Sequence, residues 1–324
     1  MMNKPTSVHS VRPGELGSIV SLIRSHLPDL ILNGPAPESL ERRLSHLIED
    51  RCLIAAVKNN AYAGVVALDL HDRQVIACHL DPEQASSTTP PRLFKAVEQR
   101  ALAYGLRKLQ CCVRNSALSM MLELGYSPTV AEHQPGKPNP LSKDLTGQAD
   151  PWTQRIFALQ DELGIPQNYG PRHRLEIVPD CEQRVSIGLD VYGREQLMDA
   201  QAATAWQQMQ EAAATKGIDL QMVSAYRGLD YQAGIIRSKL GKGQKIDSIL
   251  SVSAAPGFSE HHSGRAIDLK TPGEPPLETS FAETSAYQWL RSNAGLFGFS
   301  ESFGKNNRHG IAWEPWHWCF RSHQ

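Results

Sequence analysis

The ten residues SEHHSGRAID, at positions 259–268, bring histidines, a glycine and a carboxylate into one short stretch. Further along, EPWH (314–317) adds a second carboxylate and another histidine. A catalytic zinc takes three ligands from His and carboxylate side chains and keeps a fourth position open for water. We therefore expect His261, Asp268 and His317 to form an open metal site.

The residues between these candidates favour a convergent arrangement. Gly264 permits a turn after the first histidine, and residues 266–269 read as a strand. Pro315 argues against a helix between Glu314 and His317. Because Glu314 is not needed as a ligand, its carboxylate is available for acid/base chemistry.

Together these stretches resemble the S-x-H-x-x-G-x-A-x-D and E-x-W-H motifs of the zinc D-alanyl-D-alanine carboxypeptidases, the VanY-like family, at every fixed position. A third element of that family, S-x-Y-R, is matched by SAYR (224–227), and Gln232 follows five residues later as in many members. The resemblance covers roughly Trp152 to the last residue.

The resemblance implies a small α+β fold with zinc on an antiparallel sheet. It also implies one Zn²⁺ per chain as cofactor, a peptidoglycan-derived peptide as partner, and hydrolysis that releases the terminal D-Ala of stem peptides or their precursors.

In such an enzyme, zinc lowers the pKa of its bound water to near 7 and polarises the scissile carbonyl. Glu314 would take the proton from the water and deliver it to the leaving amine. Arg227, if it points into the site as its family counterpart does, would stabilise the oxyanion. Ser259, Tyr226 and Gln232 are the substrate-binding candidates, because the carboxylate of the peptide needs a donor.

The sequence also predicts helices and strands in the C-terminal half. Helices are expected over 152–163, 193–216 and 230–240, and a strand over 219–226. From Ser251 to the end we expect short strands and turns.

The N-terminal half shows an order of helices and strands that differs from this pattern. Helices are expected over 14–26, 38–48, 92–104 and 117–124, and the segments CLIAAV, AYAGVVALDL and RQVIACHL predict an antiparallel meander. A segment rich in Pro, Gly, Asn and Ser follows. We therefore expect domains at 1–130 and 152–324, joined by a linker at 131–151.

The motifs Asn115-Ser116-Ala117 and Leu124-Gly125-Tyr126 make the first domain resemble the GNAT acetyltransferases. This resemblance implies a GNAT-like α/β module. That family binds acetyl-CoA through a glycine-rich loop at a helix N-terminus. The equivalent segment, Glu83–Pro91, has no glycine and ends in two prolines, which lack amide donors. We expect a degenerate module and do not expect acetyl-CoA as a cofactor.

Composition places further limits on function. The 324 residues include 33 Lys and Arg against 34 Asp and Glu, so a global field for nucleic acid or anionic membranes is absent. No signal peptide or membrane-spanning segment is evident in the sequence, and we expect a cytoplasmic protein. The six cysteines include no C-x-x-C pair, which favours free thiols.

The expected fold class is thus α+β, with an N-terminal GNAT-like module and a C-terminal zinc peptidase domain whose small antiparallel sheet is flanked by helices. L,D-carboxypeptidase and D-Ala-D-Ala dipeptidase activities on the same site remain open alternatives. So do an N-acetyltransferase acting through the first domain and a non-catalytic sensor of wall peptides. The sequence leaves the native metal and the oligomeric state open.

Overall fold

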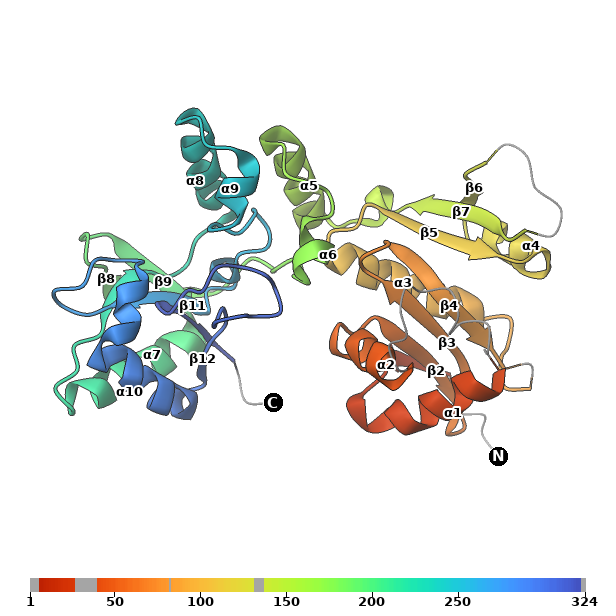
Figure 1. The fold of residues 1–324 in the computed structure, drawn as a ribbon, viewed down its shortest axis with the longest axis horizontal. Helices are drawn as coiled ribbons and strands as arrows, with labels where there is room; N and C mark the ends of the chain where they lie inside the picture. Colours follow the sequence, from red (N-terminus) through yellow and green to blue (C-terminus); the bar gives the residue numbers. More distant parts are fainter. Residues whose placement is uncertain (1–5, 27–39, 82, 131–136, 322–324) are drawn as a thin grey trace. The chain divides into compact units, whose positions relative to one another are not determined.

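A computed structural model describes residues 6–26, 40–81, 83–130 and 137–321. Its contacts divide the chain into two units, Met1–Asp150 with Gly170–Arg174, and Pro151–Tyr169 with Leu175–Gln324. Both units combine helices with β-sheet (Figure 1). The expected start of the second helix at Glu38 and the start of the linker at Ala131 lie outside the described residues.

The first unit is built on one seven-stranded sheet of order β1-β2-β3-β4-β5-β7-β6. Its strands are β1 (Ser7–Ser10), β2 (Leu53–Lys58), β3 (Ala61–Asp69), β4 (Gln74–Leu80), β5 (Lys108–Val113), β6 (Ser127–Pro128) and β7 (Asn139–Asp144). Its helices are α1 (Leu16–His26), α2 (Leu40–Glu49), α3 (Thr89–Ala103) and α4 (Asn115–Glu123). The expected meander is confirmed, because β2, β3 and β4 pair antiparallel in chain order.

Helices cover both faces of this sheet, as the alternation along β2 requires. Ile54 belongs to the core that contains Leu93 of α3, whereas Leu53 belongs to the core that contains Ile19 of α1 and Leu44 of α2. Successive side chains of the strand therefore enter two separate apolar layers.

Part of the segment expected as a linker forms a strand. β7 pairs with β5 over six residues, and Leu141 is buried in the core on the α3 side. The sequence NPLSKD contains a single large apolar residue, so its strand is formed by pairing with a neighbour rather than by an apolar pattern of its own. The polar composition of the segment concealed this pairing.

The second unit carries a four-stranded antiparallel sheet of order β10-β11-β13-β12 and a separate hairpin, β8-β9. The strands are β8 (Arg184–Leu189), β9 (Glu195–Asp199), β10 (Gln221–Ser224), β11 (Ala266–Lys270), β12 (Phe299–Glu301) and β13 (His317–Phe320). The helices are α5 (Pro151–Leu163), α7 (Ala200–Ala214), α8 (Leu229–Gly241), α9 (Ile246–Leu250) and α10 (Ser285–Asn293), with the short 3₁₀ helix η4 at Glu260–Ser263. Helix α6 (Tyr169–His173) begins at Tyr169 of this unit, but its residues 170–173 belong to the first unit.

Two apolar cores stabilise this unit. One lies between the four-stranded sheet and the helices α7 and α10, and it includes Ile267, Leu269 and Trp318. The other joins α5, α8 and α9, and it includes Phe258 and Phe303. Full burial of a side chain such as Ile267 or Leu269 stabilises the fold by about 2 kcal/mol.

The prediction of one helix over 193–216 is wrong in its first third. Residues 195–199 form strand β9, and α7 begins only at Ala200. The cause is Asp199, whose carboxylate accepts hydrogen bonds from the backbone N–H groups of Gln201 and Ala202 and so caps the helix.

Helix α10 was missed in the segment expected to hold only strands and turns. It begins after Thr284, whose hydroxyl accepts a hydrogen bond from the N–H of Tyr287. Ala286 and Leu290, four residues apart, are both buried. Among the described residues, no helix is long and apolar enough to cross a membrane.

Candidate metal centre

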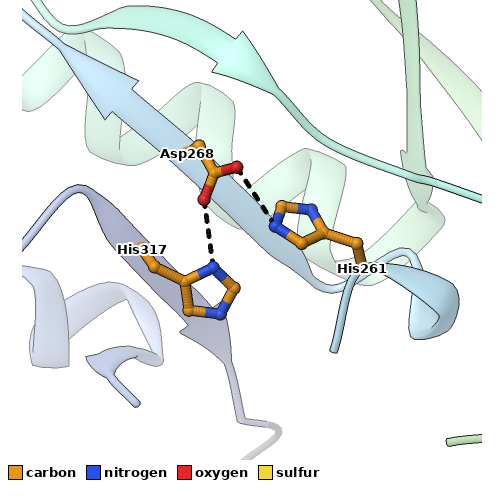
Figure 2. A group of neighbouring side chains, drawn as sticks. All are labelled: His261, Asp268 and His317. Carbon is orange, nitrogen blue, oxygen red and sulfur yellow. Dashed lines mark hydrogen bonds and ion pairs between the residues drawn. The ribbon is translucent and has the colours of Figure 1, made fainter. Parts of the chain in front are cut away.

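Strand register brings two of the three expected ligands together. Asp268 of β11 lies directly opposite His317 of β13, and their neighbours Ile267 and Trp318 are likewise paired. Because side chains alternate along a strand, the burial of Ile267 and Trp318 against α7 and α10 directs Asp268 and His317 to the opposite face. Figure 2 shows the two side chains facing one another from adjacent strands.

His261 reaches the same place from η4, which precedes β11. The turn between them depends on Gly264, whose φ is +66°. A Cβ at this position would come within 2.9 Å of the backbone nitrogen of Asp199, which donates a hydrogen bond to the carbonyl of Gly264. The glycine is thus required both for the left-handed backbone and for close packing.

The His261 ring is oriented by a backbone carbonyl. Its Nδ1 lies 2.5 Å from the carbonyl oxygen of Ala225, and its Nε2 lies 3.2 Å from Oδ2 of Asp268. Burial, reinforced by the positive charge of Arg227, lowers the pKa of His261 to about 4 despite the opposing effect of Asp268. A neutral ring that donates from Nδ1 leaves the Nε2 lone pair directed toward Asp268.

The His317 ring lies between two carboxylates. Its Nδ1 is 3.0 Å from Oδ1 of Asp268, and its Nε2 is 2.9 Å from Oε2 of Glu260. Burial opposes protonation, but these two hydrogen bonds and charges outweigh it and raise the pKa of His317 to about 10. Burial is likewise outweighed at both carboxyls, and the pKa values of Asp268 and Glu260 fall well below their usual range.

These side chains fit a metal ion. One ligand atom from each of His261, Asp268 and His317 lies within 4.8 Å of the others, and all three residues are buried. Among the described residues, Nε2 of His261 has no hydrogen-bond partner although it is buried. Two imidazoles and one carboxylate are the donor set of many catalytic zinc sites.

Glu314 lies on the chain just before β13, where its N–H donates to the carbonyl of Phe303 and its carbonyl accepts from the N–H of His317. Burial raises the pKa of its carboxyl to about 7, with smaller contributions from the charges of His317, Asp268 and Arg227. A carboxyl with a pKa in this range can exchange a proton near neutral pH.

Arg227 follows β10 and reaches the same group. Its Nη2 lies 3.9 Å from Oδ2 of Asp268, and its backbone N–H donates to the carbonyl of His261. In the described part of the chain, its buried Nε has no hydrogen-bond partner. The guanidinium therefore retains a donor for another group beside the carboxylate.

The neighbouring His262 has a different environment. Its Nδ1 lies 2.6 Å from the carbonyl oxygen of Arg227, and its Nε2 accepts a hydrogen bond from the N–H of Gly257. Burial lowers its pKa to about 4. Because both ring nitrogens are occupied, His262 connects the segments that carry His261 and Arg227 rather than offering a ligand.

The three candidates for substrate binding are placed differently. Ser259 is buried immediately before η4, next to the histidines. The hydroxyl of Tyr226 donates to Oδ1 of Asp180, 2.7 Å away, and Arg184 stacks on its ring. Gln232, on α8, is buried and donates from Nε2 to the carbonyl of Ala254. The polar side-chain atoms of Tyr226 and Gln232 thus bond to Asp180 and Ala254 and not to the three-residue group.

Glu260 was not among the residues expected from the sequence, although its Oε2 contacts His317. Its other carboxylate oxygen accepts a hydrogen bond from Nη2 of Arg321. The available signal was position alone, because Glu260 directly precedes an expected ligand within the motif.

In the N-terminal half, the glycine-free segment after β4 uses its own amides. Oδ1 of Asp81 accepts hydrogen bonds from the N–H groups of Glu83 and Gln84, and Oγ1 of Thr89 accepts one from Ser86. These donors are therefore engaged within the segment rather than directed to an anion.

A solved polyamine N-acetyltransferase of Drosophila melanogaster is similar to this chain, with 14% identity, coverage of 43% of this chain and 98% of that chain, and a TM-score of 0.34. The GNAT-like assignment stays a prediction.

A curated relative, the putative carboxypeptidase YodJ of Bacillus subtilis (strain 168), is 30% identical over 169 residues. The match covers 51% of this chain and 59% of the relative, so the chain spans less than two thirds of that protein.

Two solved carboxypeptidases are also similar. The LD-carboxypeptidase LdcB is 28% identical, with 44% of this chain and 69% of that chain covered and a TM-score of 0.40. The vancomycin-resistance D,D-pentapeptidase VanY, in a complex with Zn(II), is 23% identical, with 44% and 86% covered and a TM-score of 0.35.

The family comparison falls on the unit that carries the site. Residues 195–323 match the family model VanY, described as D-alanyl-D-alanine carboxypeptidase, and this range holds the three-residue group together with Arg227 and Glu314. The match to the VanY family model therefore falls on the part of the second unit that holds the candidate metal centre.

Proposed function

We propose that the C-terminal unit is a zinc-dependent carboxypeptidase that releases the terminal D-Ala of peptidoglycan stem peptides or their precursors. The observation that carries this proposal is the convergence of His261, Asp268 and His317, with the half-buried carboxyl Glu314 three positions before His317 in the chain, within the part that matches the VanY family. In this proposal Nε2 of His261, the carboxylate of Asp268 and Nδ1 of His317 hold the ion.

When bound, zinc supplies a Lewis acid that polarises the scissile carbonyl and lowers the pKa of a coordinated water. The chain provides the remaining chemistry. Glu314 accepts the proton of the attacking water and passes it to the nitrogen of the departing D-Ala. Arg227, which has an unpartnered Nε among the described residues, donates to the oxygen that becomes negative.

Recognition of the terminal carboxylate needs a donor near the scissile bond. Ser259 is the favoured candidate, because it is buried beside the histidines. Tyr226 and Gln232 are second candidates, since the Tyr226 hydroxyl already donates to Asp180 and the Gln232 amide to Ala254.

The test is release of D-Ala from a synthetic stem pentapeptide by the full chain, with added zinc and with a chelator. We expect release that the chelator abolishes and zinc restores. The variant His261→Ala should retain its circular dichroism spectrum and lose about 10³-fold or more in activity, since the ion is lost. Release that is unchanged by chelator or by this variant would overturn the proposal.

The same assay separates the alternatives within the family. Loss of one D-Ala from the pentapeptide but not from a tetrapeptide supports the D,D bond. Cleavage of the tetrapeptide alone assigns an L,D-carboxypeptidase, and cleavage of free D-Ala-D-Ala alone assigns a dipeptidase.

A further inference from the structure

Glu260 contacts His317 at the ring nitrogen that does not face Asp268. Its Oε2 lies 2.9 Å from Nε2 of His317, on the edge of the imidazole ring opposite to Nδ1, which faces Asp268. The two ring nitrogens of an imidazole point away from one another. A carboxylate at Nε2 therefore cannot share an ion with Nδ1 of the same ring.

Arg321 fixes the Glu260 carboxylate in turn. Its Nη2 donates to Oε1 of Glu260 and also lies 3.3 Å from Oγ of Ser302. The Glu260 side chain is 16% exposed and that of His317 is 3% exposed, so little water competes for the bond between them. Two successive hydrogen bonds, from Arg321 to Glu260 and from His317 to Glu260, thus connect an exposed arginine to the three-residue group.

This bond decides which nitrogen of His317 carries its proton. Because a carboxylate accepts, Nε2 keeps its proton, and Nδ1, the nitrogen that faces Asp268, is the one that would lose its proton to ligate a cation. The same bond limits rotation of the ring. Carboxylates bonded to the outer nitrogen of a ligand histidine commonly strengthen metal binding in this way.

We propose that Glu260 is a positioning residue that orients His317 and fixes its tautomer, and thereby strengthens binding of a divalent cation such as zinc. This inference rests on the metal site of the proposed function but not on the peptide bond that is cleaved. A different role, in which Glu260 serves only as the partner of Arg321, predicts loss of fold stability without any effect on the ion.

The experiment measures zinc affinity of the full chain at pH 7 by competition with a chromogenic chelator. We expect Glu260→Ala to weaken zinc binding about 10–100-fold. Glu260→Gln keeps an oxygen that can accept from Nε2 but loses the charge, so its loss should be smaller, about tenfold or less. With cobalt in place of zinc, the visible absorption bands of Glu260→Ala should shift, because the orientation of one ligand has changed.

Glu301 offers a matched control within the same unit. It is a buried carboxylate with an arginine partner, Arg291, and it accepts hydrogen bonds from Nε1 of Trp313 and the hydroxyl of Tyr287 rather than from the three-residue group. Glu301→Gln should lower the free energy of unfolding and leave zinc affinity and the cobalt spectrum unchanged.

The outcomes separate the two proposals. Zinc affinity within twofold of wild type in both Glu260 variants would overturn the positioning role, and if Glu260→Ala does not fold, Glu260→Gln alone decides. A wild-type chain that binds no zinc would instead overturn the proposed function, and this inference with it. A wild-type chain that binds zinc but releases no D-Ala leaves the affinity test of Glu260 valid.

Discussion

The two histidines of the candidate metal centre present different ring nitrogens to Asp268, and a hydrogen bond at the other nitrogen explains each choice. His261 donates from Nδ1 to the Ala225 carbonyl and so presents Nε2. His317 bonds to Glu260 through Nε2 and so presents Nδ1. Motif spacing identified both histidines but could not distinguish these nitrogens, because the partners depend on how distant segments meet.

The same reason explains why Glu260 was missed. It lies 57 positions from His317 and 61 from Arg321, and both contacts exist only once β11 and β13 pair in their observed register. Apart from its position directly before His261, the sequence around Glu260 contains no signal for these contacts. Likewise, nothing near Tyr226 predicts that its hydroxyl will bond to Asp180, 46 residues away.

At Glu314 the prediction concerns proton transfer. Glu314→Gln keeps the shape of the side chain but cannot accept a proton, so kcat should fall about 10²–10⁴-fold while zinc content is unchanged. In the wild type, kcat/KM should fall as the pH is lowered through the pKa of Glu314, because only the ionised form accepts a proton. That pKa is about 7 without a metal and is lowered by the charge of a bound cation.

The measurement is the pH profile of D-Ala release with zinc content determined for each sample. A Gln variant with wild-type kcat would remove Glu314 from the mechanism. Glu283→Gln, a change outside the site, serves as the control and should leave kcat unaltered.

At the scale of elements, the hairpin β8-β9 supports the metal centre indirectly. Asp190 lies in the turn between these two strands and accepts hydrogen bonds from the N–H groups of Tyr192 and Arg194 and from Nε2 of Gln196. Oε1 of Gln196 accepts from the N–H of Ala225, whose carbonyl orients His261. The prediction of a helix over residues 195–199 is wrong because Asp199 caps α7 and separates the helix from strand β9.

The prediction for this hairpin is a pH-dependent loss of stability in Asp190→Asn. Burial raises the pKa of Asp190, but its backbone hydrogen bonds and Arg194 outweigh burial and lower the pKa below its ordinary value. A carboxyl with a lowered folded-state pKa stabilises the fold above its unfolded pKa of about 3.9, and the effect is lost as pH falls through the folded value.

Asp190→Asn should therefore reduce the free energy of unfolding by about 1–3 kcal/mol at pH 7, the cost of weakening hydrogen bonds to a buried charge. The difference from wild type should shrink as the pH approaches 3. Urea unfolding followed by circular dichroism at both pH values measures it. A difference that is equal at both pH values would show that the carboxylate charge is not the cause, and Asp247→Asn provides a control outside this network.

For the whole molecule, the sequence indicated two regions, and the contacts form two units that divide after Asp150. The prediction of a linker at 131–151 differs from the structure because β7 takes its place in the first sheet by pairing with β5. Pairing between strands distant in sequence is not expressed in the composition of NPLSKD. Composition could therefore indicate that a change of domain occurs in this region, but not which residues the sheet includes.

Because each unit has apolar cores of its own, zinc should stabilise only the second unit. Calorimetry of the full chain should show two transitions. Free zinc at 100 times its dissociation constant adds about 2.7 kcal/mol to the unit that binds it. For a unit of this size the transition temperature should rise by roughly 5–10 °C. The transition of the first unit should stay in place, and His261→Ala should abolish the shift. A single transition that moves as a whole would show instead that the two units unfold together, because ligand binding then stabilises the entire chain.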